Sequence, residues 1–264
     1  MMKKILNIIY WIAIIAYMAV ALSFTGIKRN NTVCSNIKVN ITDGKHYYFV
    51  DPDDILSILK STNQRLLGCN CDTLNINRLE NIIYRHPSIR KAKVYTSLAG
   101  DLKVDIEQRK PVLRIINAYQ ESFYIDEEGK PMPLSRQYTA RVIVANGNIR
   151  NGFNETRKLM DYPFLDEPDS ITDNIPAQLF FLVRYINRYK FWNAMIEQIY
   201  VRNDEFELIP RIGNHYVLFG DISDYQEKFR KLRLLYEKGF STEGWEKYKY
   251  VNLKYHNQVI CTKR

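Results

Sequence analysis

Three serine–lysine pairs have the spacing with which penicillin-binding enzymes place a lysine beside a nucleophilic serine. They are Ser35–Lys38, Ser57–Lys60 and Ser88–Lys91. Those enzymes also carry Ser-Asp-Asn and Lys-Thr-Gly motifs, and this sequence contains neither. A short pattern that recurs in three unrelated contexts is weak evidence for acyl transfer, so we predict no catalysis at these pairs.

Nucleotide and metal sites are also not indicated. Gly147 and Gly152 have the spacing of a phosphate-binding loop, but the Lys and the Ser or Thr that complete such a loop do not follow. The acids between residues 161 and 173 form no ladder of calcium ligands. None of the histidines has metal-pair spacing; they are His46, His86, His215 and His256. We therefore expect a protein that is not an enzyme and that uses no cofactor or metal.

The cysteines have no spacing typical of a disulfide framework. They are Cys34, Cys69, Cys71 and Cys261, which allow three pairings if two bonds form. Cys69 and Cys71 are too close in sequence for a relaxed bridge. We interpret all four as structural or incidental.

An uncharged stretch from Ile5 to Phe24 has the length that crosses a bilayer as a helix. Trp11 near its start suits the membrane interface, and we name Ile5, Trp11 and Phe24 as anchor residues. A cleaved signal peptide is the alternative, since residues 19–21 fit a small-x-small cleavage site. The apolar run is longer than a usual signal core, so we favour a retained anchor, with residues 1–30 containing the cytoplasmic N-terminus, the span and the start of a linker.

The charged residues give a weaker indication of the membrane orientation and of the partners. Lys3 and Lys4 favour a cytoplasmic N-terminus, and the remaining chain then lies on the other side of a single-pass span. The net charge of +9 is explained by a solvated basic surface, with attraction to anionic lipid or to an acidic partner as the alternative. We expect no nucleic-acid partner, because no zinc-finger or RNA-binding signature is present.

The segment 31–110 predicts a small α+β domain in the order strand, helix, helix, strand, strand. Its first helix is predicted to begin at Asp51-Pro52, with Asp51 as the cap. Asn77 and Glu80 have capping-box spacing for the second helix, which we expect Pro87 to end. The three strands are predicted from alternating apolar residues at 37–41, 92–96 and 102–106.

The segment 111–264 predicts a mixed β-sheet domain with flanking helices. We expect residues 150–175 to form a loop, and helices over 176–189 and 225–238, with Ser223 and Gln226 as a capping box and Gly239 as the end of the second. The last strand is predicted over Tyr250–Cys261, at an edge of the sheet. The other strands are expected at 112–116, 122–126, 141–145, 197–202, 206–210 and 216–219.

Motifs in both segments resemble the cell-division protein family FtsQ/DivIB. The residues that carry the first motif are Pro87, Ala92, Val94, Leu102, Val104, Ile106, Gln108, Arg109, Pro111 and Val112. A second motif is aromatic-x-x-Asp-x-x-Gly, in the run Phe-Tyr-Ile-Asp-Glu-Glu-Gly that ends at Gly129, and a third is a loose Gly-x-x-Val-x-Phe-Gly hairpin from Gly213 to Gly220. The closing motif is Asn252-Leu253-Lys254-Tyr255, where the family has Asp and Arg at the first and third positions.

The resemblance implies a POTRA domain followed by the family's β domain, and a scaffold without catalytic activity in the bacterial divisome. It implies FtsB/FtsL-type partners and, through them, the septal peptidoglycan synthase. It implies a place in the cytoplasmic (inner) membrane at the division septum, with the C-terminal domains periplasmic. In the family the closing motif and apolar residues just after it contact the partner, and the matching positions here are Lys254, Tyr255 and Ile260.

Two other functions compete with the division scaffold. A POTRA-bearing transport or outer-membrane assembly factor would require a pore-forming barrel or tandem copies of the first domain, and the sequence indicates neither. An envelope hydrolase or transferase would require a clustered nucleophile or metal set, which the sequence also does not indicate.

Overall fold

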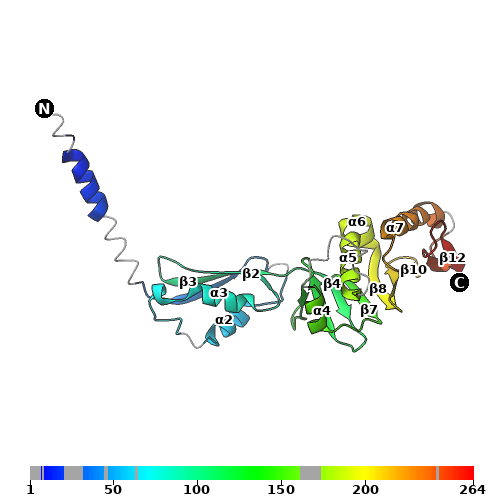
Figure 1. Ribbon diagram of the computed structural model, residues 1–264, viewed down its shortest axis with the longest axis horizontal. Coiled ribbons are helices and arrows are strands. Elements are labelled where there is room, and N and C mark those ends of the chain that lie inside the picture. Colours follow the sequence, from blue (N-terminus) through cyan, green and yellow to red (C-terminus); the bar gives the residue numbers. More distant parts are fainter. Residues whose placement is uncertain are drawn as a thin grey trace. The chain divides into compact units, whose positions relative to one another are not determined.

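The computed structural model describes residues 7, 9–20, 32–44, 47–62, 65–160, 174–241 and 244–264, with the side chains of residues 157–160 left aside. The chain divides into two compact units (Figure 1). The first unit contains residues 32–44 and Val50–Gln108, and the second contains Tyr47–Phe49 and Arg109–Arg264.

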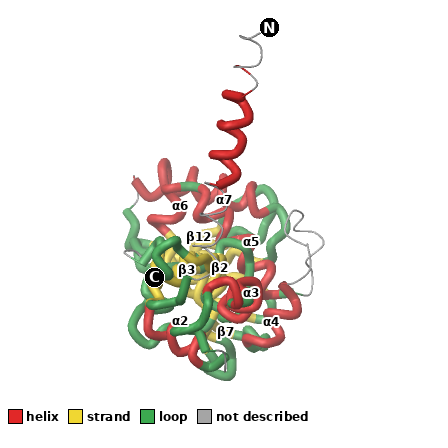
Figure 2. Tube along the Cα trace, turned by 90° about the vertical axis from the view of Figure 1, so that its left-hand side faces the viewer, coloured by secondary structure: helices red, strands yellow, loops and turns green. Residues whose placement is uncertain are grey.

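Near the N-terminus, residues 9–20 form a helix (Figure 2). Trp11 lies on it and is exposed, whereas Ile5 and Phe24 fall outside the described residues. No helix in the described part of the chain is both long and apolar enough to cross a membrane. The expected span over residues 5–24 also includes residues 5, 6, 8 and 21–24, which lie outside the described part.

The first unit is a three-stranded sheet with helices, in the strand order β1-β3-β2. β1 runs parallel to β3, and β2 runs antiparallel to it. This is the α+β arrangement and the strand–helix–helix–strand–strand order expected from the sequence. The elements are β1 (Asn36–Ile41), α2 (Pro52–Lys60), the short 3-10 helix η1 (Cys71–Thr73), α3 (Ile76–Tyr84), β2 (Ile89–Thr96) and β3 (Asp101–Gln108).

Local sequence explains how the helices of this unit begin. Asp51 caps α2 in a reciprocal capping box with Asp54, as an acid before a proline-led helix should. The cap of α3 was predicted wrongly: Asn75, not Asn77, accepts the hydrogen bond from the backbone N–H of Arg78. Glu80 is not part of a capping box, because its side chain accepts from the backbone N–H of Val94 on β2.

The second unit is built on a nine-stranded mixed sheet in the order β12-β11-β10-β9-β8-β7-β4-β5-β6 (Figure 1). Parallel pairs join β4 to β7, β7 to β8 and β10 to β11, and the other neighbours are antiparallel. The strands are β4 (Pro111–Ile116), β5 (Ser122–Asp126), β6 (Pro131–Met132), β7 (Ile143–Gly147), β8 (Ile196–Arg202), β9 (Glu205–Pro210), β10 (Tyr216–Gly220), β11 (Tyr248–Asn252) and β12 (Ile260–Lys263).

The helices of this unit share one apolar core with the sheet. The helices are α4 (Phe153–Met160), α5 (Ile175–Arg188), α6 (Lys190–Met195), α7 (Tyr225–Leu234) and the π-helical turn η3 (Leu235–Phe240). Leu182 on α5, Phe229 on α7 and Leu208 on β9 all belong to this core and are almost wholly buried. The two long helices, α5 and α7, therefore each turn an apolar face inward.

Several predictions for the second unit were wrong in detail. The expected loop at 150–175 contains α4, which begins where Glu155 accepts from the backbone N–H of Gly152, while residues 161–173 lie outside the described part. Gly239 does not end the last helix but lies inside its π-helical extension. Ser223 does not cap α7, because its hydroxyl binds Asp221 and the N-cap residue is Asp224.

The predicted last strand, Tyr250–Cys261, is two strands rather than one. β11 and β12 are joined by residues 253–259, and β12 folds back antiparallel on β11. The break has a local cause, since the side chain of Asn252 accepts from the backbone N–H of Lys254 and so favours a turn there. At this end of the sheet the edge strand is therefore β12, and the closing motif starts at the last residue of β11 and continues into the turn.

Candidate functional site

The C-terminal segments of the second unit form one edge of its sheet. We call β11, residues 253–259 and β12 together the C-terminal hairpin. β12 ends the strand order and pairs with β11, and in the part of the chain that the structure describes no strand pairs with its outer side. Such an edge leaves backbone N–H and C=O groups on which another extended chain can pair.

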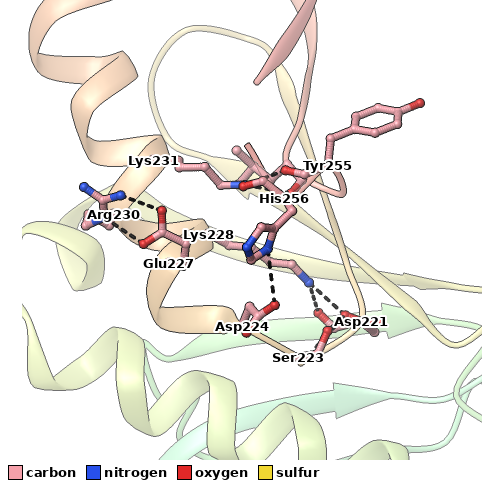
Figure 3. Close-up of polar contacts among 10 residues, drawn as sticks. Asp221, Ser223, Asp224, Glu227, Lys228, Arg230, Lys231, Tyr255 and His256 are labelled. Atoms are coloured by element: carbon pink, nitrogen blue, oxygen red, sulfur yellow. Dashed lines mark hydrogen bonds and ion pairs between the residues drawn. The ribbon is translucent and has the colours of Figure 1, made fainter. Parts of the chain in front are cut away.

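Lys231 on α7 fastens the turn of this hairpin. Its Nζ donates to the backbone carbonyl oxygens of Tyr255 at 2.7 Å and His256 at 3.2 Å, and the carbonyl of Leu253 lies at 3.5 Å (Figure 3). A single ammonium group has three donors, so one side chain can hold the whole turn. Local pattern does not predict this role, because the contact joins residues more than twenty positions apart.

Tyr255 and Ile260 are the two exposed apolar side chains of the hairpin named from the sequence. Tyr255 is 47% exposed in the turn, and Figure 3 shows its ring directed away from the polar cluster on α7. Ile260 is 41% exposed at the start of β12, opposite Asn252 of β11. The hairpin thus carries two large apolar groups beside an open strand edge.

Lys254, the third predicted residue, is tied into the fold. Its ammonium pairs with Glu205 at the start of β9, and its aliphatic part crosses the backbone at Gly220. A Cβ built on Gly220 would lie 3.2 Å from Lys254 Cγ, and the φ of +79° at Gly220 also favours glycine. Lys254 therefore positions the turn against β9 and β10.

A cavity of about 170 Å³ lies beside the turn and is lined by charges of both signs. At its floor, the largely buried Lys228 donates to the carboxylate of Asp221 at 2.8 Å and to its backbone carbonyl at 2.9 Å. Burial alone would raise the pKa of Asp221, but hydrogen bonds from Lys228 and Ser223 outweigh it and hold the pKa below its usual range. These paired charges make the cavity a polar recess rather than an apolar ligand pocket.

The recess contains serine, histidine and aspartate without a catalytic arrangement. The hydroxyl of Ser223 donates to Asp221, whereas Nδ1 of His256 lies 3.8 Å from the carboxylate of Asp224 (Figure 3). Nucleophilic catalysis requires the hydroxyl and the imidazole to share a hydrogen bond. Here each has a different acid as its partner.

The serine–lysine pairs are likewise engaged in structural contacts. The hydroxyl of Ser57 donates at 2.7 Å to the backbone carbonyl of Asp54 inside α2. The ammonium of Lys38 pairs with Asp101 at 2.7 Å across neighbouring strands. These contacts account for both groups without an acyl-transfer role.

Two of the sequence motifs meet in a buried ion pair at the start of the second unit. Arg109 Nη1 donates to Asp126 Oδ2 at 2.6 Å, and the two side chains are 7% and 0% exposed. The other carboxylate oxygen of Asp126 accepts from the backbone N–H groups of Glu128 and Lys130. The pairing connects the Arg before β4 with the Asp-x-x-Gly turn after β5, because each of these buried charges is neutralised by the other.

Family models match both units. Residues 110–262 match the model described as FtsQ/DivIB, C-terminal related, and residues 32–107 match the model of a POTRA-like domain. No curated protein matches the chain. The first match covers more than half of the chain, so the protein belongs to the FtsQ/DivIB C-terminal related family.

Proposed function

We propose that this protein is a membrane-anchored scaffold of the bacterial divisome, without catalytic activity of its own. Membership of the FtsQ/DivIB-related family supports a role in cell division, and the POTRA-like match to the first unit agrees with that domain order. The finer proposal is that the second unit binds an FtsB/FtsL-type partner and, through it, links to septal peptidoglycan synthesis.

The open edge of β12 is the observation that carries this proposal. A partner segment in extended conformation adds to such an edge, with backbone hydrogen bonds supplying affinity and alternate side chains supplying specificity. Tyr255 in the turn before β12 and Ile260 at its start are exposed, so both side chains are available to such a partner. Aromatic residues often dominate the binding energy of such interfaces, so we assign Tyr255 as the anchor and Ile260 as its neighbour.

Lys254 and Lys231 have positioning roles in this proposal. Lys254 pairs with Glu205, and Lys231 binds the carbonyls of the turn, so both fix the position from which Tyr255 projects. A partner carboxylate could also exchange with Glu205 on Lys254, because that lysine is 39% exposed.

Titration of the protein with an FtsB-like partner tests the site. Tyr255→Ala should weaken binding by at least ~30-fold, the equivalent of the ~2 kcal/mol typical of a hot spot. Tyr119→Ala is the matched control, since Tyr119 is 74% exposed and lies between β4 and β5, away from β12 in the strand order. It should leave the affinity unchanged.

Hydrogen exchange gives a second measurement that needs no mutation. Partner binding should slow amide exchange in residues 260–263 if a strand adds to β12. Equal affinity of Tyr255→Ala and the parent, with circular dichroism unchanged and no new protection in β12, would move the partner site elsewhere.

The membrane anchor is part of the same proposal, at the inner membrane and with the second unit in the periplasm. It rests on the uncharged stretch from residue 5 to residue 24 and on the lysines before it. A reporter fused after Arg264 should be active only outside the cytoplasm, and the N-terminus should not be lost by cleavage after Ala21. A cytoplasmic reporter signal would contradict both the orientation and the scaffold role.

Depletion in cells separates this function from outer-membrane assembly. Cells that lack a division scaffold should grow as filaments with unfinished septa. Intact division with defects in outer-membrane assembly would instead favour the POTRA-bearing assembly factor.

A further inference from the structure

Three of the four cysteines come together in the first unit. The chain around Cys34 pairs with the segment that leads into η1 through an antiparallel bridge between Val33 and Asn70. The backbone N–H of Cys34 donates to the carbonyl of Cys69 at 2.8 Å, and that of Cys71 donates to the carbonyl of Thr32 at 2.9 Å. Two sequence-distant segments are thereby fixed side by side with a thiol group on each.

Within this cluster the thiols are not equivalent. Cys34 is 0% and Cys71 is 6% exposed, and each thiol lies close enough to shift the pKa of the other. Cys69 is only partly buried, and its thiol donates at 3.2 Å to the carbonyl of Leu66 in its own loop. Cys34 and Cys71 are therefore the two buried thiols of the cluster, one on each segment.

We propose that Cys34 and Cys71 are a disulfide-forming pair, which thiol–disulfide oxidants convert from the two thiols of this structure into a bond between the start of β1 and η1. The antiparallel backbone pairing places the residues on neighbouring segments, as a disulfide requires. The bond does not depend on the division role proposed above. It requires only that the unit meets an oxidant that itself carries a disulfide, as in compartments outside the cytoplasm.

The exchange is balanced in two steps. One thiolate of the pair attacks the oxidant's disulfide, forms a mixed disulfide and releases one reduced thiol of the oxidant. The second protein thiolate then attacks the protein sulfur of the mixed disulfide and releases the second reduced thiol. The two protons lost by Cys34 and Cys71 end on the two released thiols, so the oxidant is reduced by two electrons.

Burial also sets when the bond forms. It raises the pKa of the Cys34 thiol and of the Cys71 thiol, and the nearby Cys69 raises both further. Both groups are therefore protonated at neutral pH in the folded, reduced protein, where the attacking thiolate is scarce. We expect the bond to form slowly in the folded protein and faster as the pH rises.

The test uses the purified full chain, incubated with oxidised glutathione at mildly alkaline pH and then alkylated. The four thiols should fall to two, and peptide mapping without reduction should find a cross-link between the peptides of Cys34 and Cys71. Dithiothreitol should restore all four. Persistence of four thiols, or a mapped bond that includes Cys69 or Cys261, would overturn the assignment.

Matched alanine variants separate the pair from its neighbours. Cys69→Ala removes a thiol of the same cluster, and Cys261→Ala removes the thiol of β12; each variant should still lose two thiols to the 34–71 bond. Cys71→Ala should not give this cross-link, and circular dichroism checks that it folds. Loss of the bond in Cys69→Ala, with that variant folded, would show that Cys69 is a member of the bonded pair and contradict the proposal.

Discussion

Removing Arg109 should destabilise the second unit more than the loss of an exposed ion pair does. Arg109→Met keeps most of the side-chain length but removes the guanidinium that lies 2.6 Å from Asp126. The carboxylate of Asp126 is 0% exposed and would keep the backbone donors of Glu128 and Lys130 as its hydrogen-bond partners. The variant therefore leaves a buried negative charge without its cation.

The expected cost follows from that burial. Breaking a buried ion pair by removing one partner typically costs about 3–5 kcal/mol, because the remaining charge has lost its compensation. In a unit of this size each kcal/mol lowers the melting temperature by about 2–4 °C. Arg109→Met should accordingly lower the melting temperature of the second unit by about 10 °C.

Thermal unfolding of the full chain, followed by tryptophan fluorescence, measures this effect. Trp192 and Trp245 both pack in the second unit, so their emission reports on its unfolding. Arg202→Met is the matched control, since it breaks the exposed Arg202–Glu207 pair on neighbouring strands, where the arginine side chain is 63% exposed. That control should cost less than about 1 kcal/mol.

A double-mutant cycle completes the test. Adding Asp126→Asn to Arg109→Met removes the buried charge while keeping a side-chain oxygen for the two backbone donors, so the double variant should recover part of the lost stability. If Arg109→Met costs no more than Arg202→Met, the Arg109–Asp126 pair is not what stabilises this turn.

Three further predictions follow from other contacts. Lys231→Met should weaken partner binding several-fold without removing a contact group, because it releases the turn that carries Tyr255. Arg230→Met is the control, since Arg230 lies on the same helix but pairs with Glu227. Equal effects of the two variants would contradict the positioning role of Lys231. Val104→Asp should lower the free energy of unfolding of the first unit by about 3 kcal/mol or more, because it buries an unpaired charge at a 0% exposed position of β3. Lys103→Asp, on the other side of the strand, should not have this effect. Similar melting curves for the two variants would show that the strand face is assigned wrongly. Burial lowers the pKa of His215, whose Nε2 lies 2.8 Å from the hydroxyl of Tyr236, so the unfolded chain binds a proton at this histidine more readily than the folded chain does. The stability is therefore full above the ordinary histidine pKa of about 6.5 and should fall as the pH drops to about 5, with a shallower fall in His215→Gln. Parallel pH profiles of the two proteins would exclude His215 as the cause.

Local pattern determined much of the fold. The period-two alternation in β3 places Leu102, Val104 and Ile106 on its buried side, and the acid–proline start of α2 caps that helix, because strand faces and helix starts depend on residues within a few positions. A resemblance of motifs, rather than local pattern, implied Lys254, Tyr255 and Ile260 as partner residues, and that role stays a prediction.

Tertiary contacts decided what local pattern could not. Between Tyr250 and Cys261 the side chain of Asn252 favours a turn locally, but what fastens that turn is Lys231, more than twenty positions earlier, which binds its carbonyls. The pairing of Arg109 with Asp126 and the backbone pairing of the segments that carry Cys34 and Cys71 also join distant residues. A side chain in the sequence shows its chemistry but not its partner, because the partner is set by how strands and helices pack. The sequence therefore determined most of the elements and their buried faces. Only the folded chain determined what fastens the turn, which acid pairs with Arg109 and which cysteines lie together.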